Sequence, residues 1–246
     1  MYKRQIGITT ANGAEIDETK MADATTINIA TGTATGVSAD IDALASKITV
    51  ASGATFNISA YTTQSLGALT NNGTIGITTA NGASIDTTKL ADANTISIGA
   101  GTCTSTAADI VTLGANKFTV ADGTTFNITA YTNQDLSNMT NSGTGTVQIN
   151  IQNSSSLTNS NLSTVNTIII PNGITISQTA DNIVTVGSSK YSVSNGGTLN
   201  ITSYTNQDLG AMTNSGTIGI TTANGAVIDE TKMACLLYTS DAADES

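Results

Sequence analysis

The chain has 246 residues, of which 39% are hydrophobic and 11% charged, and its formal net charge is −10. It contains no histidine, which excludes an imidazole general base and a Ser-His-Asp arrangement. Its acidic balance and single arginine, Arg4, exclude the basic surface with which proteins neutralise nucleic-acid phosphates, so we expect no nucleic-acid partner.

Both ends of the chain resemble a translated sequencing adapter. The codons TAT AAG AGA CAG of a transposase adapter encode residues 2–5, and the opposite strand encodes residues 235–244 without a mismatch. We therefore interpret residues 1–5 and 235–246 as adapter artefacts that flank an interior, metagenomic fragment of a longer protein. Only Cys103 then remains as a native cysteine, so no intrachain disulfide is expected.

The sequence between these ends is a tandem repeat. The string IGITTANGA begins at Ile6, Ile75 and Ile218, and a diverged copy, VQINIQNSS, begins at Val147. Self-similarity at a nearly fixed period is typical of repeat architectures. It predicts three repeat units at 6–74, 75–146 and 147–217, the third with a diverged start, followed by a truncated fourth unit at 218–234.

Within each repeat, short stretches alternate between apolar and other residues, as half-buried strands do. Taken along the chain, the predicted strands begin at Ile6, Ile27, Ile48, Ile75, Ile96, Phe118, Val147, Ile168 and Tyr191. The third strand of each repeat is followed by a further one, at 55–58, 125–128 and 198–201. Asn-Gly pairs at 12–13, 81–82 and 224–225 predict tight turns.

Apolar pairs at i, i+3, such as Ile41 with Leu44 and Ile110 with Leu113, predict single helical turns between the strands. A rung of one strand and one helical turn cannot bury an apolar face alone, whereas stacked rungs form a continuous core. The predicted fold is therefore all-β, a parallel β-solenoid or β-helix-like tandem repeat with short helical turns. The alternative is a string of small β-sandwich repeats, in which strands would follow one another every 8 to 12 residues or so.

The six lysines outside the adapter segments occupy two positions of the repeat. Those of one position follow an aspartate by three residues and give the pairs Asp17 and Lys20, Asp86 and Lys89, and Asp229 and Lys232. In the diverged copy both charges are absent together, because Thr158 and Asn161 stand there. The joint loss predicts an ion pair that fixes the register of the rungs, with a catalytic lysine as the alternative. The others, Lys47, Lys117 and Lys190, precede the third strand of each repeat.

Tyrosine and asparagine also recur at fixed repeat positions, namely Tyr61, Tyr131 and Tyr204, and Asn57, Asn127 and Asn200. We expect stacked tyrosines and inward asparagine side chains that bond along the axis of the solenoid. Alternatively, a tyrosine row would offer stacking surfaces to sugars. Paired carboxylates are the remaining acid/base groups, and no acidic pair recurs intact in every repeat, so we expect no enzyme activity, metal site or cofactor. No apolar run approaches the roughly 20 residues that span a bilayer.

The segment 108–130, which reads ADIVTLGANKFTVADGTTFNITA, resembles bacterial secreted or surface adhesin-like β-strand repeat proteins. The resemblance extends over nearly all of residues 6–234 and implies an extracellular or cell-surface location. It also implies a non-catalytic structural or adhesive role, with host or surface glycans or other cell-surface proteins as partners. The alternative function is that of a glycan-binding or glycan-active solenoid, as in a phage tail or a secreted polysaccharide-binding protein.

Overall fold

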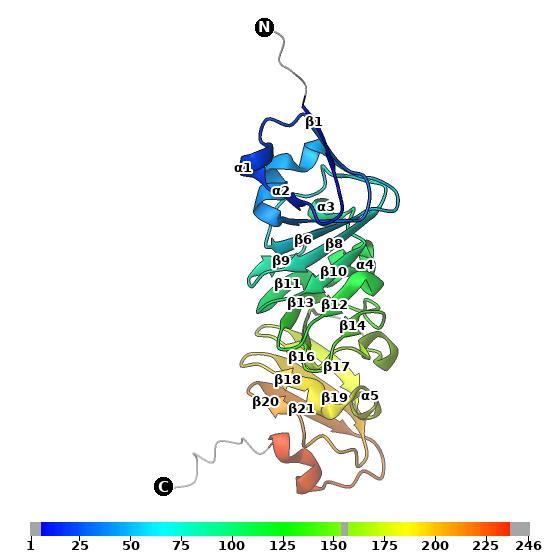
Figure 1. The fold of residues 1–246 in the computed structure, drawn as a ribbon. Coiled ribbons are helices and arrows are strands. Elements are labelled where there is room, and N and C mark those ends of the chain that lie inside the picture. The colour runs from blue at the N-terminus through cyan, green and yellow to red at the C-terminus, as the bar shows by residue number, and fades with distance from the viewer. Residues whose placement is uncertain (1–5, 154–156, 237–246) are drawn as a thin grey trace. The chain divides into compact units, whose positions relative to one another are not determined.

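The computed structural model describes residues 6–153 and 157–236 (Figure 1). The segments 1–5 and 237–246, which the sequence assigned to adapter, lie outside the described residues; Cys235 and Leu236 lie inside them and close the last short helix. The described chain forms two compact units, one of residues up to 127 with 138–146, and one of 128–137 with residues from 147 onward.

Parallel strands build the first unit. One sheet has the order β1 (Gly7–Thr10), β3 (Thr26–Ile29), β5 (Ile48–Val50), β7 (Thr70–Asn71). A seven-stranded sheet has the order β2 (Glu15–Ile16), β4 (Thr33–Val37), β6 (Thr55–Tyr61), β8 (Thr74–Thr79), β10 (Thr95–Ile98), β12 (Phe118–Val120), β14 (Thr140–Asn141). In addition, β9 (Ala83–Ser84) pairs with β11 (Thr102–Thr106). Its helical turns are α1 (Glu18–Met21), α2 (Ser38–Leu44), η1 (Ala45–Lys47), α3 (Thr87–Leu90), α4 (Ala107–Leu113) and η2 (Ala115–Lys117).

The second unit follows the same plan. Its strands pair in the orders β15 (Thr146–Ile151), β16 (Thr167–Ile170), β18 (Tyr191–Val193), β20 (Thr213–Asn214) and β17 (Thr175–Thr179), β19 (Thr198–Tyr204), β21 (Thr217–Thr222). Its helical turns are η3 (Asn159–Leu162), α5 (Ala180–Val186), η4 (Ser188–Lys190) and η5 (Glu230–Leu236). The remaining strand is β13 (Thr125–Tyr131). Repeating parallel strands with helical turns between them confirm the predicted solenoid-like fold.

Ladders of aligned apolar side chains form the core. In the first sheet Ile8, Ile27 and Ile48 occupy the same register, and Ile27 and Ile48 are fully buried. Alternate residues point out of the sheet, because successive side chains of a strand face opposite sides. Aromatic residues add to the core where the repeat carries them, and the rings of Phe118 and Phe126 stack with their centroids 5.6 Å apart.

The sequence underestimated the number of strands in each rung. A second strand was predicted for the third rung of each repeat, and β6, β13 and β19 confirm it. The second rungs also carry one, in β4, β11 and β17. The inward residues of β4 and β11 include Ala34, Gly36 and Cys103, which are too small to produce a visible apolar alternation.

Each new repeat enters the sheet in which the second strands of the preceding repeat lie. In the first unit β8 pairs with the second strand β6 on one side and with the first strand β10 on the other. The register aligns Phe56 with Ile75 and Ile58 with Ile77, then shifts at a bulge before Tyr61. In the second unit β19 and β21 pair in the corresponding register, with the same shift before Tyr204. We call this arrangement of β6 with β8, and of β19 with β21, the strand handover.

Candidate functional site

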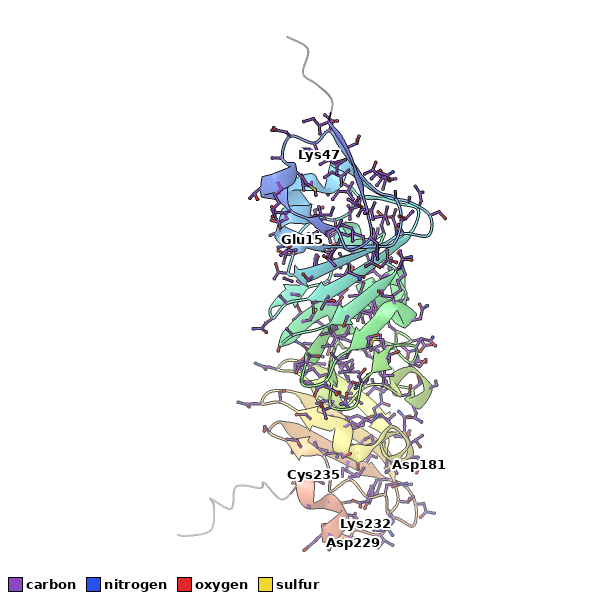
Figure 2. The ribbon with its side chains drawn as sticks, viewed as in Figure 1. Glu15, Lys47, Asp181, Asp229, Lys232 and Cys235 are labelled. Atoms are coloured by element: carbon purple, nitrogen blue, oxygen red, sulfur yellow. The ribbon has the colours of Figure 1, made fainter. Side chains whose placement is uncertain are left out.

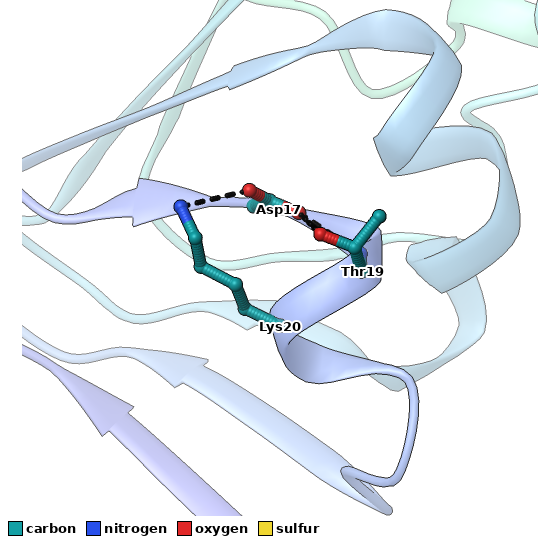
Figure 3. Close-up of polar contacts among 3 residues, drawn as sticks. All are labelled: Asp17, Thr19 and Lys20. Atoms are coloured by element: carbon teal, nitrogen blue, oxygen red, sulfur yellow. Dashed lines mark hydrogen bonds and ion pairs between the residues drawn. The ribbon is translucent and has the colours of Figure 1, made fainter.

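The polar residues that recur in the repeat gather on the helical turns and the corners, so these are the candidate site. Asp17 is the N-cap of α1, a position that aspartate favours because its side chain accepts bonds from free backbone N–H groups. Its Oδ1 accepts from the Thr19 backbone N–H at 2.9 Å and from the Thr19 hydroxyl at 2.6 Å, and Lys20 Nζ lies 2.9 Å from its Oδ2 (Figure 3). The bonds from Thr19 and then from Lys20 lower the pKa of Asp17 to about 2.

The aspartate cap recurs in two further repeats. Asp86 accepts from the Thr88 backbone N–H and hydroxyl at 2.7 and 2.6 Å, and Asp229 from the same groups of Thr231 at 3.0 and 2.7 Å. These hydrogen bonds, those from the threonine hydroxyls first, lower the pKa of both carboxyl groups. This capping role was not predicted, although an aspartate two residues before a threonine at the start of a helical turn indicates it.

The lysines of the same motif make two different contacts. Within the described ranges, an Asp–Lys ion pair shorter than 4 Å forms at Asp17 and Lys20 alone. Lys232, which Figure 2 labels beside Asp229, instead donates from Nζ to the backbone carbonyl of Asn206 at 3.1 Å. In the diverged copy Asn161 donates from its amide to the carbonyl of Asn133, the residue equivalent to Asn206, at 3.3 Å. The predicted ion pair therefore describes Asp17, whereas Lys232 and Asn161 bond to the backbone of the neighbouring rung.

The second lysine position also joins rungs. Lys47 donates to the carbonyl of Ala22 at 2.9 Å, Lys117 to that of Ala93 at 2.7 Å and Lys190 to that of Leu162 at 3.5 Å. Ala22 is the C-cap of α1 and Leu162 ends η3, where carbonyl groups lack helical partners and attract cations, whereas Ala93 lies three residues beyond the end of α3. All three lysines are half-buried, and burial lowers the pKa of Lys190.

The recurring tyrosines are core residues. Tyr61, Tyr131 and Tyr204 are 0% exposed, and each ends a second strand. Their strands belong to three different sheets, so no ladder of paired strands aligns the three tyrosines with one another. Burial raises the pKa of Tyr131 to about 12 and also raises that of Tyr61. Tyr61 donates to the carbonyl of Ser84 at 3.5 Å, which joins its hydroxyl to the next rung.

The prediction that the recurring asparagines point inward is wrong. Asn57 is exposed, and Asn127 and Asn200 are half-buried, because each stands between two buried residues of its strand and so faces outward. Asn57 lies over Gly76 of the neighbouring strand, where an added Cβ would come within 2.9 Å of its Oδ1. The glycine of the IGI segment thus leaves room for the outward asparagine.

A recurring glutamine, which was not predicted as a site residue, shapes the loop after each tyrosine. Gln64, Gln134 and Gln207 accept from the backbone N–H two residues earlier at 2.9, 2.9 and 2.8 Å. Gln207 also donates to Asp181 on α5 at 2.6 Å, and Gln64 accepts from Ser38 on α2 at 2.7 Å. The threefold pattern Tyr-Thr-x-Gln would have revealed this loop-to-helix contact.

The Asn-Gly turns are confirmed, and they form corners between strands of the stack. Gly13, Gly82 and Gly225 have φ of 80°, 80° and 78°, which glycine adopts without strain. Asn12 Oδ1 accepts from the backbone N–H of Thr33 at 2.8 Å, and Gly13 donates to the carbonyl of Thr33 at 2.7 Å. The corner at Asn81 makes the same two bonds to Thr102, so these two corners are each bonded to the following rung.

Cys103 occupies a buried position aligned with Ala83, as expected for a small apolar residue. Burial raises the pKa of its thiol to about 12, so the reactive thiolate is not formed near neutral pH. Within residues 6–153 and 157–236, no cluster of three or more acidic or cysteine side chains could hold a metal ion. The same residues contain no helix long and apolar enough to cross a membrane.

Comparison of the chain with protein-family models, curated proteins and solved structures gave no match.

Proposed function

We propose that this chain is a non-catalytic structural or adhesive repeat segment of a secreted or cell-surface protein. The observation that carries the proposal is the use of the recurrent charged side chains. Aspartates cap helical turns, and lysines bond to backbone carbonyls of the neighbouring rung, as in Asp86 and Lys117. Charges placed in this way stabilise the stack of rungs.

The strand handover supports the same proposal. β8 and β21 open the second and the fourth repeat, which both begin with IGITTANGA, and each joins the preceding second strand in an equivalent register. One repeat can therefore follow another through the same contacts, which suits a protein that extends by adding repeats. Spacer and stalk segments use such extension to hold another part of a protein at a distance.

The burial of the tyrosines favours this role over a glycan-binding or glycan-active solenoid. Sugar rings stack on exposed aromatic faces, and Tyr61, Tyr131 and Tyr204 are 0% exposed. Surface glycans and other cell-surface proteins remain the proposed partners of an adhesive face.

Stretching single molecules of the full chain between its ends would test the structural role. We expect stepwise unfolding, in which one rung of about 20 residues releases roughly 70 Å of extended chain. Unfolding of the whole chain at forces too small to measure would overturn the structural role. A parallel screen of the chain against a glycan panel tests the alternative, since saturable binding to one glycan would favour a glycan-binding solenoid.

A further inference from the structure

Apart from the last copy at 224–225, four Asn-Gly pairs of the described residues form corners in which the glycine has the same left-handed conformation. The glycines are Gly13, Gly82, Gly173 and Gly196, with φ of 80°, 80°, 77° and 78°. All four asparagines are exposed. We infer that the corner at Asn195-Gly196 is a site of spontaneous deamidation, whereas the following rung protects the other three.

Two of the corners make two bonds each to the following rung. Asn12-Gly13 bonds to Thr33, and Asn81-Gly82 bonds to Thr102. In each case the threonine N–H donates to the asparagine Oδ1, and the threonine carbonyl accepts from the glycine N–H at 2.7 or 2.8 Å. Both reactive groups of these Asn-Gly pairs are therefore held by the next rung.

The corner at Asn172-Gly173 makes one such bond. Gly173 donates its N–H to the carbonyl of Gly196 at 3.0 Å. The Asn172 side chain lies against the following rung, because an added Cβ at Gly196 would collide with its Oδ1. This corner is thus covered by the corner at Asn195-Gly196, which stacks on it.

The corner at Asn195-Gly196 has neither bond, although the rungs on both sides of it belong to the described residues. No residue within 6–153 and 157–236 bonds to Asn195 Oδ1 or to the Gly196 N–H. The following corner, 214–217, has only four residues and crosses the chain on either side of the pair. A Cβ at its Gly216 would collide with the carbonyl oxygens of Ser194 and Gly197.

The second repeat shows how a longer corner covers the equivalent position. There the following corner reads NSGTGT at 141–146, whereas the third repeat has NSGT at 214–217. The backbone N–H of Thr144 donates to Asp122 Oδ1 at 2.9 Å, and the Gly123 N–H donates to Thr144 Oγ1 at 3.2 Å. The two groups that are free at Asn195-Gly196 are therefore engaged where the following corner is longer.

Deamidation at an Asn-Gly pair uses these two groups. The Gly196 backbone nitrogen attacks Cγ of Asn195, a new N–Cγ bond forms, and the Cγ–Nδ2 bond breaks. Ammonia leaves, and the proton lost by the glycine nitrogen balances the one that the leaving group takes up. Water then opens the five-membered imide at either carbonyl, which yields aspartate or isoaspartate without any oxidation or reduction.

A covered corner opposes this reaction in two ways. A bonded glycine N–H keeps the nitrogen from losing its proton, and a bond to Oδ1 holds the asparagine side chain away from that nitrogen. Each bond must open before the imide can form. Local opening of two hydrogen bonds slows a reaction by about tenfold or more.

Peptide mapping of the whole chain tests the inference. The folded chain is incubated in mildly alkaline buffer and digested with trypsin, which places the four asparagines in peptides 5–20, 48–89, 118–190 and 191–232. Fragmentation of each peptide in the mass spectrometer locates the modified asparagine. The rate at each site is divided by its rate in denaturant, which removes the effect of neighbouring residues.

This ratio should be at least about tenfold higher at Asn195 than at Asn12 and Asn81, with Asn172 between them. Equal ratios at Asn195, Asn12 and Asn81 would overturn the inference.

A matched pair of insertions tests whether the short corner is the cause. Insertion of Gly-Thr between Ser215 and Gly216 reproduces the NSGTGT corner over Asn195 and should slow its deamidation by about tenfold. The same insertion between Asn72 and Gly73 lengthens the equivalent corner of the first repeat and should leave Asn195 unchanged. Slow deamidation at Asn12 and Asn81 shows that each variant is folded. Unchanged deamidation at Asn195 in the first folded variant, or equal slowing in the second, would contradict protection by a longer corner.

Discussion

Charged side chains in this chain act mainly as partners for backbone groups. Asp17, Asp86 and Asp229 accept from N–H groups at the start of a helical turn, while Lys47 and Lys117 donate to carbonyls of a neighbouring rung. Each partner would otherwise lack an intrahelical bond. Few charges are thus enough to define the ends of many short helical turns.

The cap at Asp17 predicts a specific response to acid. The pKa of this carboxyl is about 2 in the folded chain, against about 3.9 when unfolded. The stabilisation by the carboxylate is therefore complete above the unfolded pKa and is lost as pH falls through the folded value. Amide exchange at Thr19 should accelerate between about pH 4 and pH 2 relative to a residue remote from any carboxyl. Asp17→Asn should flatten that relative profile; an unchanged profile would show that the cap does not control the turn.

The two lysine positions should respond differently to loss of charge. Lys117 is half-buried and bonded to Ala93, so Lys117→Met, which keeps most of the apolar stem, should lower the free energy of unfolding by about 0.5–1.5 kcal/mol. Lys20 is exposed, and its ion pair with Asp17 is screened by solvent, so Lys20→Met should cause no measurable change. Urea unfolding of both variants checks the contrast, which fails if the two midpoints shift equally.

At the residue scale, the sequence revealed positions better than partners. The repeat indicated equivalent positions for the aspartates, lysines and tyrosines, but it did not indicate that Lys232 bonds to Asn206, 26 residues away. Such contacts depend on which residues of neighbouring rungs lie side by side, and the spacing of residues in the sequence does not determine this alone. The prediction that Asn57 points inward failed for a different reason. Asn57 stands between the buried residues Phe56 and Ile58 of one strand, and this alternation, rather than the residue type, determines that its side chain faces outward.

At the scale of elements, the corner before each handover strand is sterically demanding. A Cβ at Gly73 would collide with the backbone carbonyls of Ala51 and Ala54, which cannot move independently. At Gly76, three residues later, the nearest atoms are side-chain oxygens of Asn57 and Thr95 at 2.9 and 3.2 Å. The two glycines therefore have different reasons for lacking a side chain.

This difference predicts unequal effects of the same substitution. Gly73→Ala should lower the free energy of unfolding by about 1–3 kcal/mol, as overpacking against rigid atoms does. Gly76→Ala should cost less than about 1 kcal/mol, because a flexible asparagine can turn away and alanine suits a strand better than glycine does. Denaturant midpoints of the two variants provide the comparison, and a larger loss at Gly76 would refute this account of the corner.

The size of the inward residues decided whether several strands were predictable as elements. Ile27, Ile48 and Ile96 mark β3, β5 and β10 by alternation alone. β4 and β11 escaped prediction because Ala34 and Cys103 fill their inward positions. The side chain of a helical turn fills part of the space that a small inward residue leaves in the core. A Cβ at Gly36 would collide with the side chain of Ile41 on α2.

At the scale of the whole molecule, rungs depend chiefly on their neighbours, so damage should remain local. Phe118 is fully buried in β12 and stacks on Phe126, and Phe118→Ala should cost about 3–5 kcal/mol. Hydrogen exchange followed by mass spectrometry should show faster exchange in β10, β12 and β14, with β17, β19 and β21 unchanged, as nearest-neighbour stability requires. Uniform acceleration across both compact units would instead indicate one cooperative block.

The repeat predicted a stack of rungs, but the strand handover was not predictable. The sequence treats each repeat as a copy of the last, which suggests that equivalent strands stack on one another. In the structure the bulges before Tyr61 and Tyr204, with Ala60 and Ser203 at φ of 53° and 56°, bring the next repeat into the sheet of second strands. Non-glycine residues in this conformation arise from tertiary packing, and no local sequence rule signals them.

The handover also constrains how a gene of this kind can change. The segments 6–22 and 218–234 are identical except that Glu15 corresponds to Val227. DNA that encodes such near-identical segments is prone to unequal recombination. Gain or loss of a whole repeat joins a second strand to an IGITTANGA strand, as β6 joins β8 and β19 joins β21. Loss of a single rung would place unlike strands against each other. We therefore expect length variants of such a gene to differ by entire repeats, because such changes preserve both the reading frame and the pairing of strands between repeats.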